Sequence, residues 1–147
     1  MHKGELTVIS PEVEKIMNER FGKDSIIALA TVNDGMPAVR NVDAYYDSGS
    51  FYIITYALSD KMRQIENNRN VAVCGEWFTA RGTAENIGYF GSDENKETAA
   101  KLTSAFSEWI NNGHNDFSDK NTIILRVKLD KAVLFSMGTR YDIDFSD

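Results

Sequence analysis

Apolar residues recur at helical spacing near the start of the chain. They are three or four positions apart and share one face of a helix that we predict over residues 10–21: Val13, Ile16, Met17 and Phe21. Ser10 is a favourable N-cap, Pro11 suits the first turn, and Gly22 suits the position after the last turn. We expect this face to cover a hydrophobic core.

Beyond this helix the pattern changes to short apolar runs separated by turn residues, as is typical of β-hairpins. We predict three strands, over residues 26–32, 38–46 and 50–56. The turns between them contain Asp and Gly, which tolerate the positive φ angles of hairpin turns. In the second strand the polar residues Arg40, Asn41 and Asp43 interrupt the apolar run. One face of that strand should therefore meet solvent or a ligand.

The rest of the chain continues as strands and two more helices. A short helix is predicted over residues 59–68, with Ser59 as its N-cap and Met62 and Ile65 turned inward. Four further strands are predicted over residues 71–78, 79–87, 122–129 and 132–137, with Asp130 and Lys131 as a turn. A third helix is predicted over residues 92–112, with a core face of Ala99, Leu102, Thr103, Phe106, Trp109 and Ile110.

So many strands with so few covering helices must close on themselves, because an open sheet would expose unpaired edges. The predicted fold class is mainly β (α+β), an antiparallel barrel of six to seven strands with flanking helices. At 147 residues the chain suits one domain, over residues 1–147.

Composition narrows the function classes. The net charge is -6, and no run of Lys or Arg offers a track for a nucleic-acid backbone. No apolar stretch has the length of a signal peptide core or of a membrane span, so we expect a soluble, cytoplasmic protein. The single cysteine, Cys74, excludes an intrachain disulfide and a Cys-rich zinc site, and we expect it in the core.

One segment carries candidate chemistry: the third strand runs directly into the short central helix. A helix N-terminus offers unpaired backbone N–H groups and partial positive charge, which favour an anion. Lys61 lies in the first turn, where a cation disfavours the helix unless it meets an anion. Thr55 and Ser59 can donate hydroxyl hydrogen bonds, and Arg40 can reach the same point from the neighbouring strand.

The structural alternative is that each of these residues serves only the fold. Ser59 is then only a cap and Lys61 only solvated, while Arg40 pairs with Asp43 or Asp60. The convergence of four such groups on one corner favours a bound phosphate.

An ordered set of motifs lies within residues 26–85: Leu29–Val32, Asp34–Gly35 with Pro37, Arg40–Val42, Ile54–Thr55, Ser59–Lys61, Gln64–Asn68, Val71–Val73 and Gly82–Glu85. In this order the motifs resemble those of the pyridoxamine 5′-phosphate oxidase-like FMN-binding split barrels. The resemblance implies a split β-barrel that forms a homodimer with FMN in a groove at the interface. Each motif alone is weak, and their order makes the resemblance specific.

The resemblance also implies roles for individual residues. Arg40 and Lys61 correspond to phosphate ligands, and Thr55 and Ser59 to supporting hydroxyls. The strand edge at Asn41, Val42 and Ile54 corresponds to the part that meets the flavin ring. Asp60 stands where the family's biosynthetic oxidase has a second basic residue, so the resemblance implies a weaker phosphate clamp here.

Since the resemblance implies a cofactor at the dimer interface, it also implies that Glu76, Trp77 or Arg81 can approach the flavin from the partner chain. Of these we favour Trp77, whose alternative role is an aromatic in the dimer core. Arg140 either covers the flavin or is a surface charge.

The resemblance implies an FMN-dependent oxidoreductase or flavin reductase acting on a small molecule, with NAD(P)H as a candidate reductant and no assigned catalytic residue. Pyridoxamine phosphate is disfavoured as substrate, because the C-terminal basic signature of the oxidase is missing. The alternatives are a flavin- or haem-binding sensor or carrier, with His114 as the candidate haem ligand, and an interaction dimer that has lost its cofactor. The native ligand stays open between FMN and a related flavin or deazaflavin.

Overall fold

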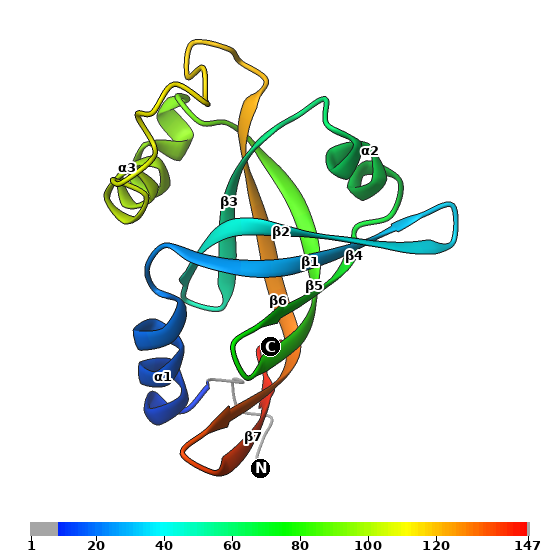
Figure 1. Ribbon diagram of the computed structural model, residues 1–147, viewed down its shortest axis with the longest axis vertical. Coiled ribbons are helices and arrows are strands. Elements are labelled where there is room, and N and C mark those ends of the chain that lie inside the picture. The colour runs from blue at the N-terminus through cyan, green and yellow to red at the C-terminus, as the bar shows by residue number, and fades with distance from the viewer. Residues whose placement is uncertain (1–8, 147) are drawn as a thin grey trace.

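Seven antiparallel strands form one sheet, and six of them close into a barrel (Figure 1). The computed structural model describes residues 9–146. The strands are β1 (Ser25–Asn33), β2 (Met36–Asp47), β3 (Ser50–Tyr56), β4 (Asn70–Gly75), β5 (Phe78–Tyr89), β6 (Thr122–Ser136) and β7 (Thr139–Asp144). Their order is β3-β2-β1-β4-β5-β6-β7, and pairing of β3 with β6 closes the barrel. The predicted mainly β, antiparallel split barrel is confirmed.

The barrel is split because β6 changes its partner along its length. One edge of β6 pairs with β3 from Thr122 to Lys128 and with β7 from Lys131 to Ser136. Between these two stretches, Arg81 of β5 faces two residues of β6 instead of one, so the strand contains a β-bulge. The bulge directs the second half of β6 away from the closed barrel and lets β7 add to it.

Three helices accompany the barrel: α1 (Pro11–Phe21), α2 (Asp60–Asn67) and α3 (Lys96–Ala105), the last preceded by a 3₁₀ turn at Asp93–Asn95. In Figure 1, α1 and α3 lie on one side of the barrel and α2 lies on the other. The apolar face of α1 joins the barrel core, as predicted, while Leu102 of α3 and Phe106, just after the helix, belong to a separate cluster that contains Ile124 of β6. None of the helices among the described residues is long and apolar enough to cross a membrane.

The first half of the chain follows the prediction closely. The Ser10 hydroxyl accepts the amide hydrogen of Val13 at 3.2 Å, so the predicted N-cap of α1 is confirmed. The β1–β2 turn has φ angles of 51° at Asp34 and 82° at Gly35. Both values lie in the left-handed region that a tight hairpin turn requires, so the sequence signal for this turn was correct.

The boundary between β4 and β5 was predicted wrongly. The expected strand over residues 71–78 ends at Gly75, and the chain reverses at Glu76 and Trp77 before β5 begins at Phe78. Trp77 has a φ of 51°, although a Trp in the left-handed region is uncommon. Without Gly, Asn or Pro at its centre, this turn gave no sequence signal.

The predicted turn at Asp130–Lys131 was also wrong, since these two residues form the bulge inside the continuous strand β6. Before the bulge the odd-numbered residues of β6 face the core, and after it the even-numbered residues do. The actual turn is at Met137–Gly138, where both φ angles are positive, and it leads into β7, which was not predicted. The expected total of seven strands therefore arose from two compensating errors.

Two smaller expectations were wrong. The third helix ends at Ala105 rather than near residue 112, and Thr103 is exposed rather than part of its core face. Cys74 is exposed on the outer face of β4, because Val71 and Val73 take the inward positions of that strand. Strand alternation therefore excludes Cys74 from the core.

Candidate functional site

The inner faces of three strands turn from apolar to polar at one end of the barrel. Along β1 the inward series is Ile27, Leu29 and Thr31; along β2 it is Arg40, Val42, Ala44 and Tyr46; along β3 it is Phe51, Ile53 and Thr55. The period of two in a strand places the polar members, Thr31, Arg40 and Thr55, at the same end. We call the group that they form with α2 residues Ser59, Lys61 and Gln64 the barrel-end site.

Helix α2 lies against this end and supplies the rest of the site. Met62 and Ile65 bury their side chains in the core and so fix the helix in place. Lys61 and Gln64 are three residues apart and therefore share a face of the helix. That face meets the polar ends of β1, β2 and β3.

Hydrogen bonds join these side chains into one network. The Lys61 ammonium donates to the Thr55 hydroxyl at 2.5 Å. The Arg40 guanidinium donates to the Leu29 carbonyl oxygen at 3.1 Å, to Thr31 Oγ1 at 2.8 Å and to Gln64 Oε1 at 3.1 Å. All these partners are uncharged, so the network orients both cations without neutralising either.

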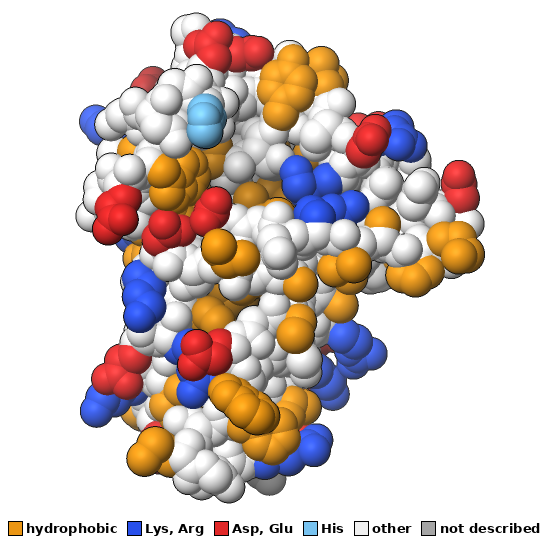
Figure 2. Space-filling view, in the orientation of Figure 1, with side chains coloured by type: hydrophobic (Ala, Val, Ile, Leu, Met, Phe, Trp, Pro, Cys, Tyr) orange, Lys and Arg blue, Asp and Glu red, His pale blue; other side chains and the backbone are white. Residues whose placement is uncertain are grey.

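No carboxylate among residues 9–146 forms an ion pair with Arg40 or Lys61. Burial, and then repulsion from Arg40, lower the pKa of the Lys61 ammonium below its ordinary value. Burial also lowers the pKa of Arg40. Figure 2 shows Lys and Arg side chains side by side between α2 and the barrel. Two partly buried cations with no ion-pair partner among residues 9–146 are an arrangement that favours binding of an anion.

The N-terminus of α2 adds hydrogen-bond donors. Ser59 caps the helix by accepting the Met62 amide hydrogen at 3.3 Å, which leaves its own hydroxyl hydrogen free to donate. The amides of Asp60 and Lys61, in the first turn, have no acceptor within the helix. The Asp60 carboxylate is exposed and pairs with Arg63 at 3.3 Å, so only its backbone is available to the site.

A family model described as pyridoxamine 5′-phosphate oxidase matches residues 12–133. The chain belongs to this family. The match includes β1 to β5 in full and β6 up to residue 133. It also includes α2, α3 and all of α1 except its first residue. A comparison with curated protein sequences finds no match.

Solved structures with the same fold differ in what they are described as binding. An FAD-binding protein from Mesorhizobium loti has a TM-score of 0.60 and 18% identity, and the alignment covers 86% of this chain and 94% of that protein's chain. An F420 reductase has a TM-score of 0.63 and 20% identity, with coverage of 78% and 94%. A haem-binding protein from Mycobacterium smegmatis has a TM-score of 0.70 and 13% identity, with coverage of 94% and 60%. At these identities the similarity establishes the fold alone.

The strand residues that the family resemblance assigns to the flavin ring fall in different environments. Asn41 is exposed on the outer face of β2, whereas Val42 faces inward and packs against the core. Ile54 packs against the second cluster, under α3. Asn41 and Val42 lie on β2 and Ile54 on β3, so these residues share only the backbone of those strands with the barrel-end site.

Three other candidate residues lie outside the barrel-end site. Trp77 is in the β4–β5 turn, and this turn is at the far end of β4 from α2 (Figure 1). Its ring centroid lies 6.3 Å from that of Phe135. Arg140 lies on β7 and pairs with Asp142 at 3.0 Å. His114 is exposed in the loop after α3. Any role of Trp77 at the site therefore requires a second copy.

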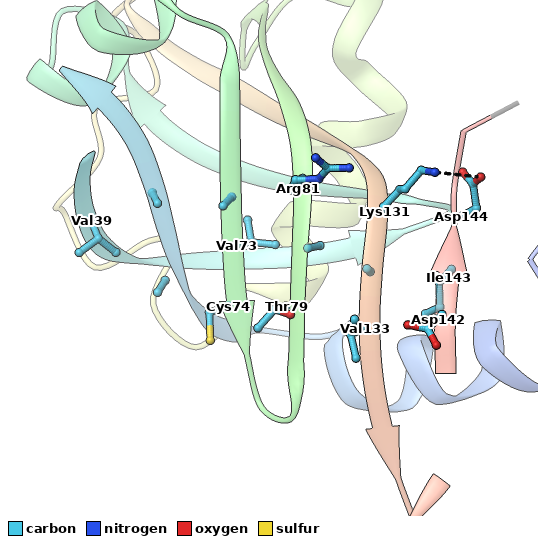
Figure 3. A pocket seen from close by; sticks show the side chains of 15 residues that line it. Val39, Val73, Cys74, Thr79, Arg81, Lys131, Val133, Asp142, Ile143 and Asp144 are labelled. Carbon is cyan, nitrogen blue, oxygen red and sulfur yellow. Dashed lines mark ion pairs between the residues drawn. The ribbon is translucent and has the colours of Figure 1, made fainter. Parts of the chain in front are cut away.

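A groove of about 700 Å³ runs over the outer face of the sheet (Figure 3). Small or apolar residues line it: the outward-facing residues are Ala28, Ala30, Val39, Ala72, Cys74 and Val133, and the inward-facing residues Ala80 and Ala132 also border it. One end is polar, with Arg81 beside the Lys131–Asp144 pair. Val39 lines the groove and immediately precedes Arg40, and because successive strand residues point to opposite faces, the groove and the barrel-end site lie on opposite faces of β2.

Two members of the site were missed by sequence reasoning as functional residues. Thr31 is 2% exposed and Gln64 is 7% exposed. The signals were present: Thr31 continues the inward series of β1, and Gln64 follows Lys61 at helical spacing. Neither signal identifies the partner, because the contact with Arg40 depends on how β1, β2 and α2 pack together.

Proposed function

We propose that this protein is a homodimeric flavoprotein that binds FMN by its phosphate at the barrel-end site and acts as an FMN-dependent oxidoreductase or flavin reductase on a small molecule. The observation that carries the proposal is the pair of partly buried cations, Arg40 and Lys61, with no carboxylate partner among residues 9–146. A phosphate dianion supplies the missing negative charge. The FAD-binding and F420 reductase structures support a flavin-type ligand for this fold.

The donors of the site suit a phosphate monoester. Arg40 supplies a planar fork and Lys61 a compact charge, while the first amides of α2 and the hydroxyls of Thr55 and Ser59 can bond the remaining oxygens. When bound, FMN would supply two-electron redox chemistry through its ring system. In this proposal the role of the protein is to bind and orient the cofactor and to exclude water.

The outer face of the sheet supports the proposed homodimer. On this face the exposed fractions of Ile26 and Val39 are 67% and 68%, and that of Trp77 at the β4–β5 turn is 70%. Exposed large apolar side chains beside an apolar groove are typical of an interface. A second copy covering the groove would lie against the outer face of β2, the strand that carries Arg40 on its inner face, and we propose that the cofactor is shared between the two chains. It would also bury Trp77, either against the cofactor or in the dimer core.

Two features guide the proposal on substrate and reductant. Pyridoxamine phosphate is disfavoured, because the C-terminal strand carries one arginine, Arg140, and its charge is already paired with Asp142. NAD(P)H is proposed as reductant, since nicotinamide can dock on a flavin without a dinucleotide-binding motif. That choice fits the cytoplasmic location expected from the sequence.

A carrier or sensor that holds the cofactor without turnover is the second candidate. The barrel-end site explains binding of a phosphate and does not by itself explain turnover. The haem-binding structure with the same fold supports this class of function. Haem would need an axial ligand, and the one histidine of the described residues, His114, is exposed on a loop.

Two measurements test the proposal. Protein purified after expression with riboflavin in the medium should be yellow and release FMN on denaturation, and anaerobic mixing with NADPH should bleach the flavin absorbance within seconds. Bound flavin that NADPH and NADH both fail to reduce would favour the carrier. Protein that neither purifies with flavin nor binds added FMN would contradict the proposal.

A further inference from the structure

The Arg40 side chain is held on one side by two buried neighbours. Its Nη1 donates to Thr31 Oγ1 at 2.8 Å and its Nη2 to Gln64 Oε1 at 3.1 Å, while Thr31 donates its own hydroxyl hydrogen to Gln64 Oε1 at 2.6 Å. Nη1 also donates to the Leu29 carbonyl oxygen. Thr31 and Gln64 are almost fully buried, so neither can bond water in place of Arg40.

These bonds use one particular edge of the guanidinium. Thr31 Oγ1 and Gln64 Oε1 are hydrogen-bonded to each other. They therefore lie together at the tip of the guanidinium, along the edge between Nη1 and Nη2. A guanidinium has five N–H donors, and the three bonds leave Nε–H and one Nη2–H. Neither has an acceptor among residues 9–146. These two hydrogens form the side edge, whose parallel N–H bonds match two oxygens of a phosphate.

The chemistry of the two neighbours preserves the charge of Arg40. An amide and a hydroxyl accept hydrogen bonds without adding negative charge, whereas a carboxylate at either position would form an ion pair with the guanidinium. The orientation of the Gln64 amide is also determined, since a flipped amide would place its NH₂ group against donors of Arg40. The site thus holds an arginine that is fixed in place and still fully charged.

We propose that Thr31 and Gln64 are positioning residues that lock Arg40 with its Nε–Nη2 edge turned toward a phosphate. The inference rests on the proposed function of the barrel-end site as a phosphate site. Neither residue contacts the ligand. They increase affinity because a long arginine side chain that is already fixed loses less conformational entropy when the phosphate binds.

Matched substitutions separate positioning from packing. Thr31→Val keeps the shape and removes the hydroxyl, while Thr31→Ser keeps the hydroxyl. Gln64→Leu removes the acceptor, and Gln64→Glu keeps an acceptor but adds the charge that the native site avoids. If these residues serve only the core, Thr31→Ser should be the more harmful change at position 31, because it removes a buried methyl group.

The experiment is titration of the flavin-free full-length protein and its variants with FMN and with riboflavin, followed by flavin fluorescence. Thr31→Val and Gln64→Leu should each weaken FMN binding roughly tenfold and leave riboflavin binding unchanged. Thr31→Ser should stay close to wild type, and Gln64→Glu should lose the most FMN affinity. Unchanged FMN affinity in Thr31→Val and Gln64→Leu, or equal losses for both ligands, would overturn the inference.

Titration with inorganic phosphate, followed by ³¹P line broadening, distinguishes failure of the positioning role from failure of the proposed function. If the wild type does not bind FMN but binds phosphate, and Thr31→Val weakens that binding, the positioning role stands and the FMN assignment falls. If phosphate binding is equal in the wild type and Thr31→Val, the positioning role falls. If the wild type binds neither ligand, both proposals are wrong.

Discussion

Lys61 is close enough to Arg40 for the guanidinium charge to lower the pKa of its ammonium, and its hydrogen bond goes to the neutral hydroxyl of Thr55. Bringing two cations together in a partly buried site costs free energy unless an anion joins them. The cost is fixed by the fold, because Arg40 belongs to a barrel strand and Lys61 to a helix anchored by Met62 and Ile65. A bound phosphate would offset it.

Substitution of either cation should therefore discriminate between flavins. Arg40→Ala and Lys61→Ala should each weaken FMN binding by roughly 10- to 100-fold, because each removes a charge-assisted hydrogen bond to phosphate. Riboflavin carries no phosphate, and its affinity should stay nearly unchanged. Fluorescence titration with both ligands measures the difference.

Arg63 provides the matched control for these two variants. It lies on the same helix as Lys61, but its side chain is exposed and pairs with Asp60. Arg63→Ala should leave the affinity for both flavins close to wild type, since exposed ion pairs contribute little. An equal loss of FMN and riboflavin affinity in Lys61→Ala would count against phosphate recognition.

The lowered pKa of Lys61 predicts how stability depends on pH. The folded, flavin-free protein binds the Lys61 proton more weakly than the unfolded chain does, so protonation opposes folding below the folded-state pKa. This cost declines as pH rises toward the ordinary lysine pKa of 10.5. Lys61→Met should consequently raise the melting temperature at pH 7, by about 2–4 °C for each kcal/mol of stability recovered. This gain should shrink as the pH approaches the lysine pKa of the unfolded chain.

Thermal denaturation of flavin-free protein at neutral and alkaline pH checks this prediction. Addition of FMN should reverse the order, because FMN stabilises the wild type more than Lys61→Met. A lower melting temperature for Lys61→Met at pH 7 without flavin would mean that Lys61 already has a stabilising partner.

The barrel and its site were predictable from the sequence to different degrees. Hairpins with Asp-Gly or Ser-Gly turns, and helices with clear caps, carry their own local signals, and these elements were correct. The turn at Trp77 depends on how β4 and β5 pair, and the bulge at Asp130–Lys131 on how β5 and β6 pair. Local sequence cannot reveal such pairing, because a polar pair looks the same in a bulge and in a turn.

The same distinction applies to the site. Lys61 could be identified because a cation in the first turn of a helix is unfavourable unless it meets an anion. Arg40 could be identified because it interrupts the apolar pattern of a strand. Thr31 and Gln64 gave no such anomaly, since a threonine in a strand and a glutamine in a helix are ordinary. Their importance arises from contacts between β1, β2 and α2 that exist only once the barrel closes.

The proposed dimer can be tested with one charge on the outer face. Val39 is 68% exposed and lines the groove, so Val39→Asp would bury a carboxylate in the interface. We expect the wild type to sediment as a dimer at micromolar concentration and Val39→Asp to dissociate at least about 100-fold more readily.

Met137 offers a control of equal chemistry. It is 99% exposed, lies in the β6–β7 turn and does not line the groove. Met137→Asp should leave the sedimentation of the protein unchanged. A wild type that sediments as a monomer would show that the groove is not the dimer interface.

Gly82 is expected to be essential for closing the barrel. A Cβ atom at this position would lie 2.5 Å from the Lys128 carbonyl oxygen and 3.2 Å from Val127 Cγ1, both on β6. Gly82→Ala should lower the free energy of unfolding by about 2–4 kcal/mol, because β5 and β6 must move apart. Urea denaturation measures this loss.

Gly35 is a suitable comparison, since nothing lies within 4 Å of a Cβ built there. Its φ of 82° is tolerated by Asn, so Gly35→Asn should cost less than about 1 kcal/mol. Similar losses for both variants would mean that the approach of β5 to β6 is looser than the structure indicates.

The most direct measurement is calorimetric titration of the flavin-free wild-type protein with FMN and riboflavin under the same conditions. The two ligands differ only in the phosphate, so the ratio of their dissociation constants reports the contribution of all phosphate contacts, including those of Arg40 and Lys61. We predict that FMN binds at least about 100-fold more tightly, as expected for two charge-assisted contacts. Equal affinities, or no detectable binding of FMN, would contradict a phosphate site at the end of this barrel.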